Sequence, residues 1–62
     1  MSITDDLQLA QANEQLLRLY RSLAILKADL GESNPTAFKI LSEGPLNEIK
    51  SIRETISEYT DE

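Results

Sequence analysis

Residues 9–30, LAQANEQLLRLYRSLAILKADL, carry apolar side chains at alternating intervals of three and four residues. Neither Gly nor Pro interrupts this stretch. The spacing places the apolar side chains along one side of an α-helix, and three heptad repeats of it are typical of helices that pack against other helices. The members of this stripe are Leu9, Ala12, Leu16, Leu19, Leu23, Leu26 and Leu30. We therefore predict one long helix that lays this stripe against a partner helix.

Local signals mark both ends of this helix, which we expect to span about residues 4–30. Ser2 and Thr4 are candidate N-caps, because a hydroxyl oxygen there can accept hydrogen bonds from the first free backbone N–H groups. Two aspartates follow, where a helix N-terminus favours negative charge. At the other end, we expect Gly31 in the left-handed conformation that closes many helices.

The apolar stripe is wider than pairing with a single helix requires. Leu17, Tyr20 and Ala24 extend it to one side, so that roughly half of the helix circumference is apolar. A stripe of this width is typical of a helix that contacts two or three others, as in a four-helix bundle. The width therefore predicts contacts beyond those with one neighbouring helix.

A turn is predicted at residues 31–34, before a second helical segment. Ser33 or Asn34 can cap this segment with a side-chain oxygen. Pro35 suits its first position, where the missing backbone N–H costs no hydrogen bond. The chain is therefore expected to reverse here and to return antiparallel to the first helix.

The returning arm is interrupted at Gly44-Pro45, because a proline clashes with the carbonyl four residues earlier and glycine weakens a helix. We predict either a kink at this point or a break between two helical segments, 35–42 and 45–60. In one continuous register the apolar side chains of both segments fall on the side that we expect to face the first helix. They are Phe38, Leu41, Leu46, Ile49, Ile52, Ile56 and Tyr59.

Residues 1–62 are thus predicted to form a single all-α domain, an antiparallel helical hairpin that associates into a four-helix bundle. A chain of 62 residues hides only about 60% of its unfolded surface, and this one has no cysteine for a disulfide. Association is the remaining way to bury two broad stripes, which makes a homodimer or higher oligomer the expected state. The predicted self-association interface consists of Leu9, Leu16, Leu19, Tyr20, Leu23, Leu26, Phe38, Ile49, Ile52, Ile56 and Tyr59.

The residue types argue against an enzyme. The chain has neither His nor Cys, which are the commonest general base near neutral pH and the usual ligands of transition metals. The serines have no activating base, and the two glycines are too isolated to cradle a phosphate. We therefore expect no catalytic residue, no metal, no cofactor and no small-molecule substrate.

A protein partner is the first functional hypothesis. Leu7, Ile25 and Ile40 lie off the two stripes, and together they are a candidate surface for an unidentified protein partner. The chain contains no apolar run long enough to cross a membrane, and its first residues lack the basic and apolar segments of a secretion signal. We accordingly predict an interaction or regulatory protein of the cytoplasm.

RNA binding is the alternative function. Arg18 and Arg21 share the outer side of the first helix, and Lys50 and Arg53 lie three residues apart on the second. These four side chains are a candidate RNA patch, although their spacing from Glu14 and Glu54 also suits surface ion pairs. The net charge of −5 argues against general nucleic-acid binding, which depends on basic surfaces.

Overall fold

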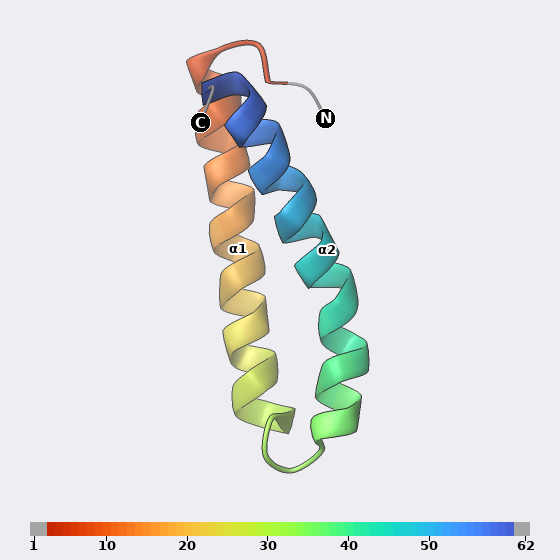
Figure 1. Ribbon diagram of the computed structural model, residues 1–62. Coiled ribbons are helices and arrows are strands. Elements are labelled where there is room, and N and C mark those ends of the chain that lie inside the picture. The colour runs from red at the N-terminus through yellow and green to blue at the C-terminus, as the bar shows by residue number, and fades with distance from the viewer. Residues whose placement is uncertain (1–2, 61–62) are drawn as a thin grey trace.

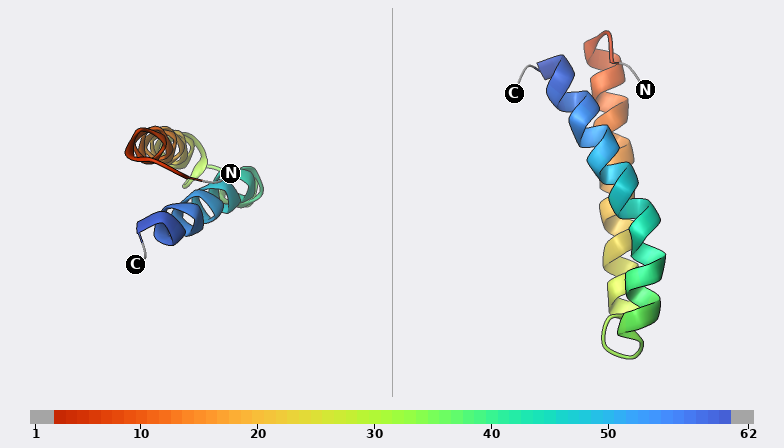
Figure 2. Two further views of the ribbon diagram at one scale, coloured as in Figure 1. Left: turned by 90° about the horizontal axis from the view of Figure 1, so that it is seen from above. Right: turned by 45° about the vertical axis from the view of Figure 1, so that its right-hand side comes forward.

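The computed structural model describes residues 3–60 and contains two α-helices joined by a short turn (Figure 1). Helix α1 spans Asp6–Leu30 and helix α2 spans Pro35–Thr60. The helices pack side by side and run antiparallel, in a molecule with extents of 42 × 17 × 14 Å (Figure 2). Residues 3–60 contain no strand. The predicted all-α hairpin is therefore confirmed.

Helix α1 begins two residues later than predicted, because Asp5 is its N-cap. Asp5 has extended backbone angles, and its carboxylate accepts a 2.8 Å hydrogen bond from the backbone N–H of Gln8. The side-chain oxygen of Gln8 accepts in return from the backbone N–H of Thr4 at 2.7 Å. This reciprocal pair resembles a capping box and satisfies two N–H groups at once. The prediction of Thr4 as the cap was wrong, and Ser2 lies outside the described residues.

The turn between the helices differs from the expected one at Gly31. This residue keeps right-handed helical angles, φ −54° and ψ −40°, and donates its N–H to the carbonyl of Lys27 at 2.8 Å. The left-handed closure predicted for Gly31 is therefore wrong, because the chain stays helical here and reverses in the residues that follow. The cap of the second helix is Asn34, whose side chain accepts from the N–H of Ala37 at 3.1 Å. Pro35 is the first residue of α2, as predicted.

Helix α2 runs through Gly44-Pro45 without a break, so that residues 43–44 belong to the helix. The alternative of two separate segments is therefore wrong. Proline removes one backbone hydrogen bond, and Gly44 lacks the Cβ atom that clashes with a following proline ring in a helix. Figures 1 and 2 show the axis of α2 changing direction part-way along its length, as expected for a helix that contains a proline.

The line along which the two helices pack, here called the seam, takes the predicted stripe of α1 in full. All six of its leucines are half-buried and Ala12 is buried. On α2, in contrast, the side chains in the seam follow a register that was only partly predicted. They are Phe38, Ser42, Pro45, Ile49, Ile52, Ile56 and Tyr59, at a strict alternation of four and three residues.

Leu41 and Leu46 were predicted to face the core and do not. They are 54% and 51% exposed, on either side of the seam. Ser42 takes the central position instead and is 4% exposed, because its hydroxyl donates to the carbonyl of Lys39 at 3.1 Å and so needs no other partner. With Ser42 and Pro45 in the seam, the register of α2 leaves Leu41 and Leu46 on either side of it.

The core of the hairpin is thin. Among residues 3–60, the buried apolar side chains are Ile3, Ala12 and Ile49. The segment before α1, which carries Ile3, arches over the open end of the hairpin in Figure 1. Neither helix is long and apolar enough to span a membrane over the described residues. A single hairpin thus leaves most of its leucine and isoleucine side chains partly in contact with water.

Candidate interaction surface

Two exposed faces flank the seam, and each consists of one row of side chains from each helix. The first, which we call the Tyr20 face, consists of Asn13, Leu17, Tyr20, Ala24 and Lys27 of α1 with Lys39, Glu43, Leu46, Lys50 and Arg53 of α2. All ten of these residues are exposed. The second, which we call the Glu48 face, consists of Gln15, Arg18, Ser22, Ile25 and Asp29 of α1 with Leu41, Glu48, Ser51, Thr55 and Glu58 of α2. Thr55 is half-buried and the other nine residues are exposed.

Grooves along the seam place these rows on the same side of the molecule. Asn13 and Leu16 of α1 line one groove together with Arg53 of α2. Arg53 also lines an adjoining groove with Leu46 and Lys50. Since Arg53 lines both grooves, the α2 row that contains Leu46 lies on the same side of the hairpin as Asn13. The Tyr20 face is therefore one continuous surface across both helices.

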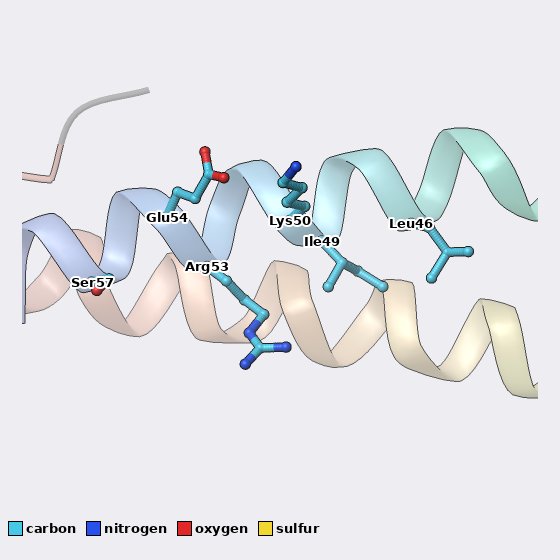
Figure 3. Close-up of a pocket in the computed structure, with 6 residues that line it drawn as sticks. All are labelled: Leu46, Ile49, Lys50, Arg53, Glu54 and Ser57. Carbon is cyan, nitrogen blue, oxygen red and sulfur yellow. The ribbon is translucent and has the colours of Figure 1, made fainter. Parts of the chain in front are cut away.

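Figure 3 shows how the α2 side chains of this surface lie. Leu46, Ile49 and Arg53 reach towards α1, whereas Lys50 and Glu54 point away from it. Apolar side chains thus occupy the centre of the Tyr20 face beside the seam. The amine of Lys50 lies at its rim.

The apolar centre of the Tyr20 face is compact. Two pairs of residues show which positions of α1 and α2 lie at the same level along the hairpin. Asp6 is hydrogen-bonded to Tyr59, and Gln15 lines a groove together with Ser51. The residue numbers of positions at one level therefore add up to 65 or 66. Leu46 is therefore level with residues 19–20 of α1, beside Tyr20 and one turn from Leu17. These three side chains are about half exposed, at 51%, 45% and 58%. They share one face and neighbouring levels of the hairpin, and are here called the apolar cluster.

The Glu48 face is polar over most of its length. Gln15 and Arg18 of α1 line its groove with Glu48 and Ser51 of α2. Its exposed apolar side chains are Ile25 and Leu41, both towards the turn. Three carboxylates and one arginine make this face acidic, whereas the Tyr20 face has four cations and one carboxylate. The two faces therefore differ in both apolar character and charge.

The predicted self-association residues mostly lie in the seam, where the other helix of the same chain buries Ile49 and half-buries the rest. Tyr20 is the exception, since its ring lies on the exposed Tyr20 face. Sequence reasoning missed Leu46 as a member of that face. A signal was available, because counting back from Ile49 in steps of four and three gives Pro45 and Ser42, which excludes Leu46 from the seam.

The candidate partner residues are all exposed, as predicted, but the structure does not bring them together. Leu7 lies on the outer side of α1 and Ile25 lies on the Glu48 face, 18 residues and thus about 27 Å apart along the helix. Glu14, Arg18 and Arg21 lie between them along α1. Ile40 lies on the outer side of α2. These three side chains therefore belong to separate patches.

The candidate RNA residues are likewise divided between different sides of the hairpin. Arg18 lines the groove of the Glu48 face, whereas Lys50 and Arg53 line a groove of the Tyr20 face. Arg21 lies on the outer side of α1, between these faces. The four cations thus form no single patch, although Lys50 and Arg53 are neighbours.

A polar contact links the two helices at the open end of the hairpin. The hydroxyl of Tyr59 donates a 2.7 Å hydrogen bond to Oδ1 of Asp6. Because this bond requires the protonated phenol, it raises the pKa of Tyr59 above its usual 10.0, and desolvation and the negative charges of Asp6 and Asp5 act in the same direction. This bond holds the last turn of α2 against the first turn of α1.

Within residues 3–60 no group of three or more acidic, His or Cys side chains is arranged to hold a metal ion. The chain matches no protein-family model, no curated protein and no solved structure.

Proposed function

We propose that this chain is a self-associating helical hairpin that works by contact between proteins and not by catalysis. Its first partner is a second copy of itself, and the pair forms a four-helix bundle. The observation that carries this proposal is the thin seam, which leaves six leucines of α1 only half-buried. Leu17, Tyr20 and Leu46 are also exposed together on one face.

The energetic reason is the amount of apolar surface left in water. Burying a fully exposed Leu or Ile side chain contributes about 1.5–3 kcal/mol, so completing the burial of a half-buried one contributes about half as much. Small domains have a total stability of only about 5–15 kcal/mol. Two hairpins that pack face to face bury the exposed cluster and deepen the burial of the seam. Association therefore supplies a substantial part of the stability that one hairpin lacks.

The arrangement of charges favours protein contact over RNA binding. Arg18 lies on a different face from Lys50 and Arg53, so that at most two of the four candidate cations can meet one RNA backbone closely. Apolar clusters rimmed by charged side chains are a common feature of protein interfaces. We also propose that the protein acts in the cytoplasm, as its sequence predicts.

The test is the solution mass, measured by sedimentation equilibrium, with helicity followed by circular dichroism across a dilution series. We expect a species near twice 7.0 kDa whose helicity falls on dilution. As a control, Leu7→Glu on the outer side of α1 should leave the mass unchanged, because Leu7 lies on neither face. A helical monomer that keeps its helicity at all concentrations would overturn the proposal.

A further inference from the structure

The Tyr20 face has a pattern that complements itself. An interface between two identical chains with two-fold symmetry requires that, where residue i contacts residue j of the partner, j also contacts i. On α2, Glu43 and Lys50 carry opposite charges and lie three residues before and four residues after Leu46. On α1, Leu17 and Tyr20 are apolar and lie one turn apart.

The register of the hairpin brings the centres of these two pairs to one level. The midpoint between Glu43 and Lys50 is position 46.5, and the midpoint between Leu17 and Tyr20 is position 18.5. These midpoints add up to 65, which is also the sum of the residue numbers of Asp6 and Tyr59, the pair hydrogen-bonded across the hairpin. One two-fold axis across the Tyr20 face can therefore relate both pairs to their counterparts.

Charge selects the orientation of the second copy. In a parallel dimer α1 of one copy covers α2 of the other at the same level, which brings Lys27 close to Lys39 of the partner subunit. In the antiparallel dimer α2 covers α2 of the partner, and Glu43 faces Lys50 of the partner subunit twice over. Like charges opposed across an interface suppress association, and opposite charges favour it.

The size of the face is sufficient for a stable dimer. A surface 42 Å by 17 Å covers about 700 Å² on each copy, so that about 1,400 Å² is buried in total, which is within the range of specific protein interfaces. The Glu48 face has similar dimensions, but polar side chains occupy its centre.

Resting on the proposed self-association, we infer that the second copy binds the Tyr20 face in an antiparallel orientation. Leu46 of each chain then meets Leu46 of the partner subunit close to the two-fold axis. Leu17 packs against Tyr20 of the partner subunit, and Glu43 pairs with Lys50 of the partner subunit at the rim.

Disulfide trapping tests this arrangement cleanly, because the natural chain contains no cysteine. On mild oxidation, Leu46→Cys should give a covalent dimer, since the two Leu46 side chains lie together at the axis. Leu41→Cys, a leucine of nearly equal exposure on the Glu48 face, is the matched control and should stay uncrosslinked. Crosslinking of Leu41→Cys instead, or crosslinking of Leu46→Cys only when mixed with Tyr20→Cys, would overturn the inference.

Charge reversal gives a second test that does not depend on an introduced thiol. Glu43→Lys and Lys50→Glu each oppose like charges in both symmetric pairs, and each should weaken the dimer about tenfold. The double variant should return to within about threefold of the natural chain. Rescue cannot arise inside one chain, because seven residues separate the two positions by about 10 Å along α2.

The outcomes separate this inference from the proposed function. If the natural chain sediments as a dimer but the double reversal binds no better than the single ones, the inference is wrong and self-association stands. If the natural chain is a helical monomer throughout, both are wrong. Circular dichroism of each variant at high concentration shows whether its helices have formed.

Discussion

Leu41 and Leu46 are equally exposed leucines on opposite sides of one helix, yet their surroundings differ. Leu46 lies beside Tyr20 in an apolar cluster with a cationic rim, whereas Leu41 lies on a face whose groove is lined by Gln15, Glu48 and Ser51. Exposure of a single apolar side chain is ordinary on protein surfaces, and a contiguous patch is what indicates an interface. The difference between the Tyr20 face and the Glu48 face is therefore one of clustering.

Placing a carboxylate at each of these leucines should give the largest difference between the faces. Leu46→Glu opposes two unpaired carboxylates near the proposed axis, and we expect the dimer to weaken at least a hundredfold, or about 2.7 kcal/mol. Leu41→Glu makes the same chemical change at a leucine of matching exposure and should alter the dissociation constant less than threefold. Sedimentation equilibrium measures both, and equal effects would remove the distinction between the faces.

The seam shows how far the sequence alone predicts this fold. The stripe of α1 was predicted residue by residue, because seven apolar side chains at heptad spacing can all face the second helix in only one register. On α2 the stripe is incomplete near Ser42 and Pro45, so the apolar residues Leu41 and Leu46 indicated a core position that neither occupies. Steps of four and three back from Ile49 do lead to Ser42, but hydrophobicity alone gives no reason to place there a serine that satisfies its own hydroxyl locally.

The candidate site was predicted in part. The width of the α1 stripe indicated Leu17, Tyr20 and Ala24 as a surface for further contacts, and these residues do lie together on one face. Their counterpart on α2 was missed, because it depends on which side of the seam Leu46 lies. The side is set by the packing of two helices, and that information is not local to either of them.

Replacing each of the two glycines by alanine should change the stability of the hairpin in opposite directions, by less than the effect of Leu46→Glu on the dimer. At Gly31 an added Cβ atom would lie 2.5 Å from the carbonyl oxygen of Lys27, so Gly31→Ala should destabilise the hairpin by more than about 1 kcal/mol. At Gly44, on the solvent side of α2 away from the Tyr20 face, the same atom meets nothing within 4 Å apart from its neighbours in the chain. Gly44→Ala should therefore stabilise the helix, by about 0.5 kcal/mol, because the proline that follows reduces the usual gain.

Thermal unfolding followed by circular dichroism at one fixed protein concentration measures both glycine variants. Gly44→Ala should leave the dissociation constant of the dimer unchanged, which serves as a second check that the Gly44 side of α2 takes no part in association. A loss of stability in Gly44→Ala would show that the helix needs glycine before Pro45 for its bend.

The smallest effect concerns the open end of the hairpin, which lies beyond the apolar cluster of the Tyr20 face. Because the bond to Asp6 raises the pKa of Tyr59 in the folded chain above 10.0, its contribution to stability is fully present below that pH. It is lost as the pH rises through the raised pKa. In a Tyr20→Phe background, where Tyr59 is the single tyrosine, the ultraviolet absorbance of the phenolate should report this pKa directly. The substitution Asp6→Asn should move the pKa of Tyr59 back towards 10.0. If Tyr59 titrates at or below 10.0 while Asp6 is intact, the hydrogen bond does not hold the ends of the two helices together in solution.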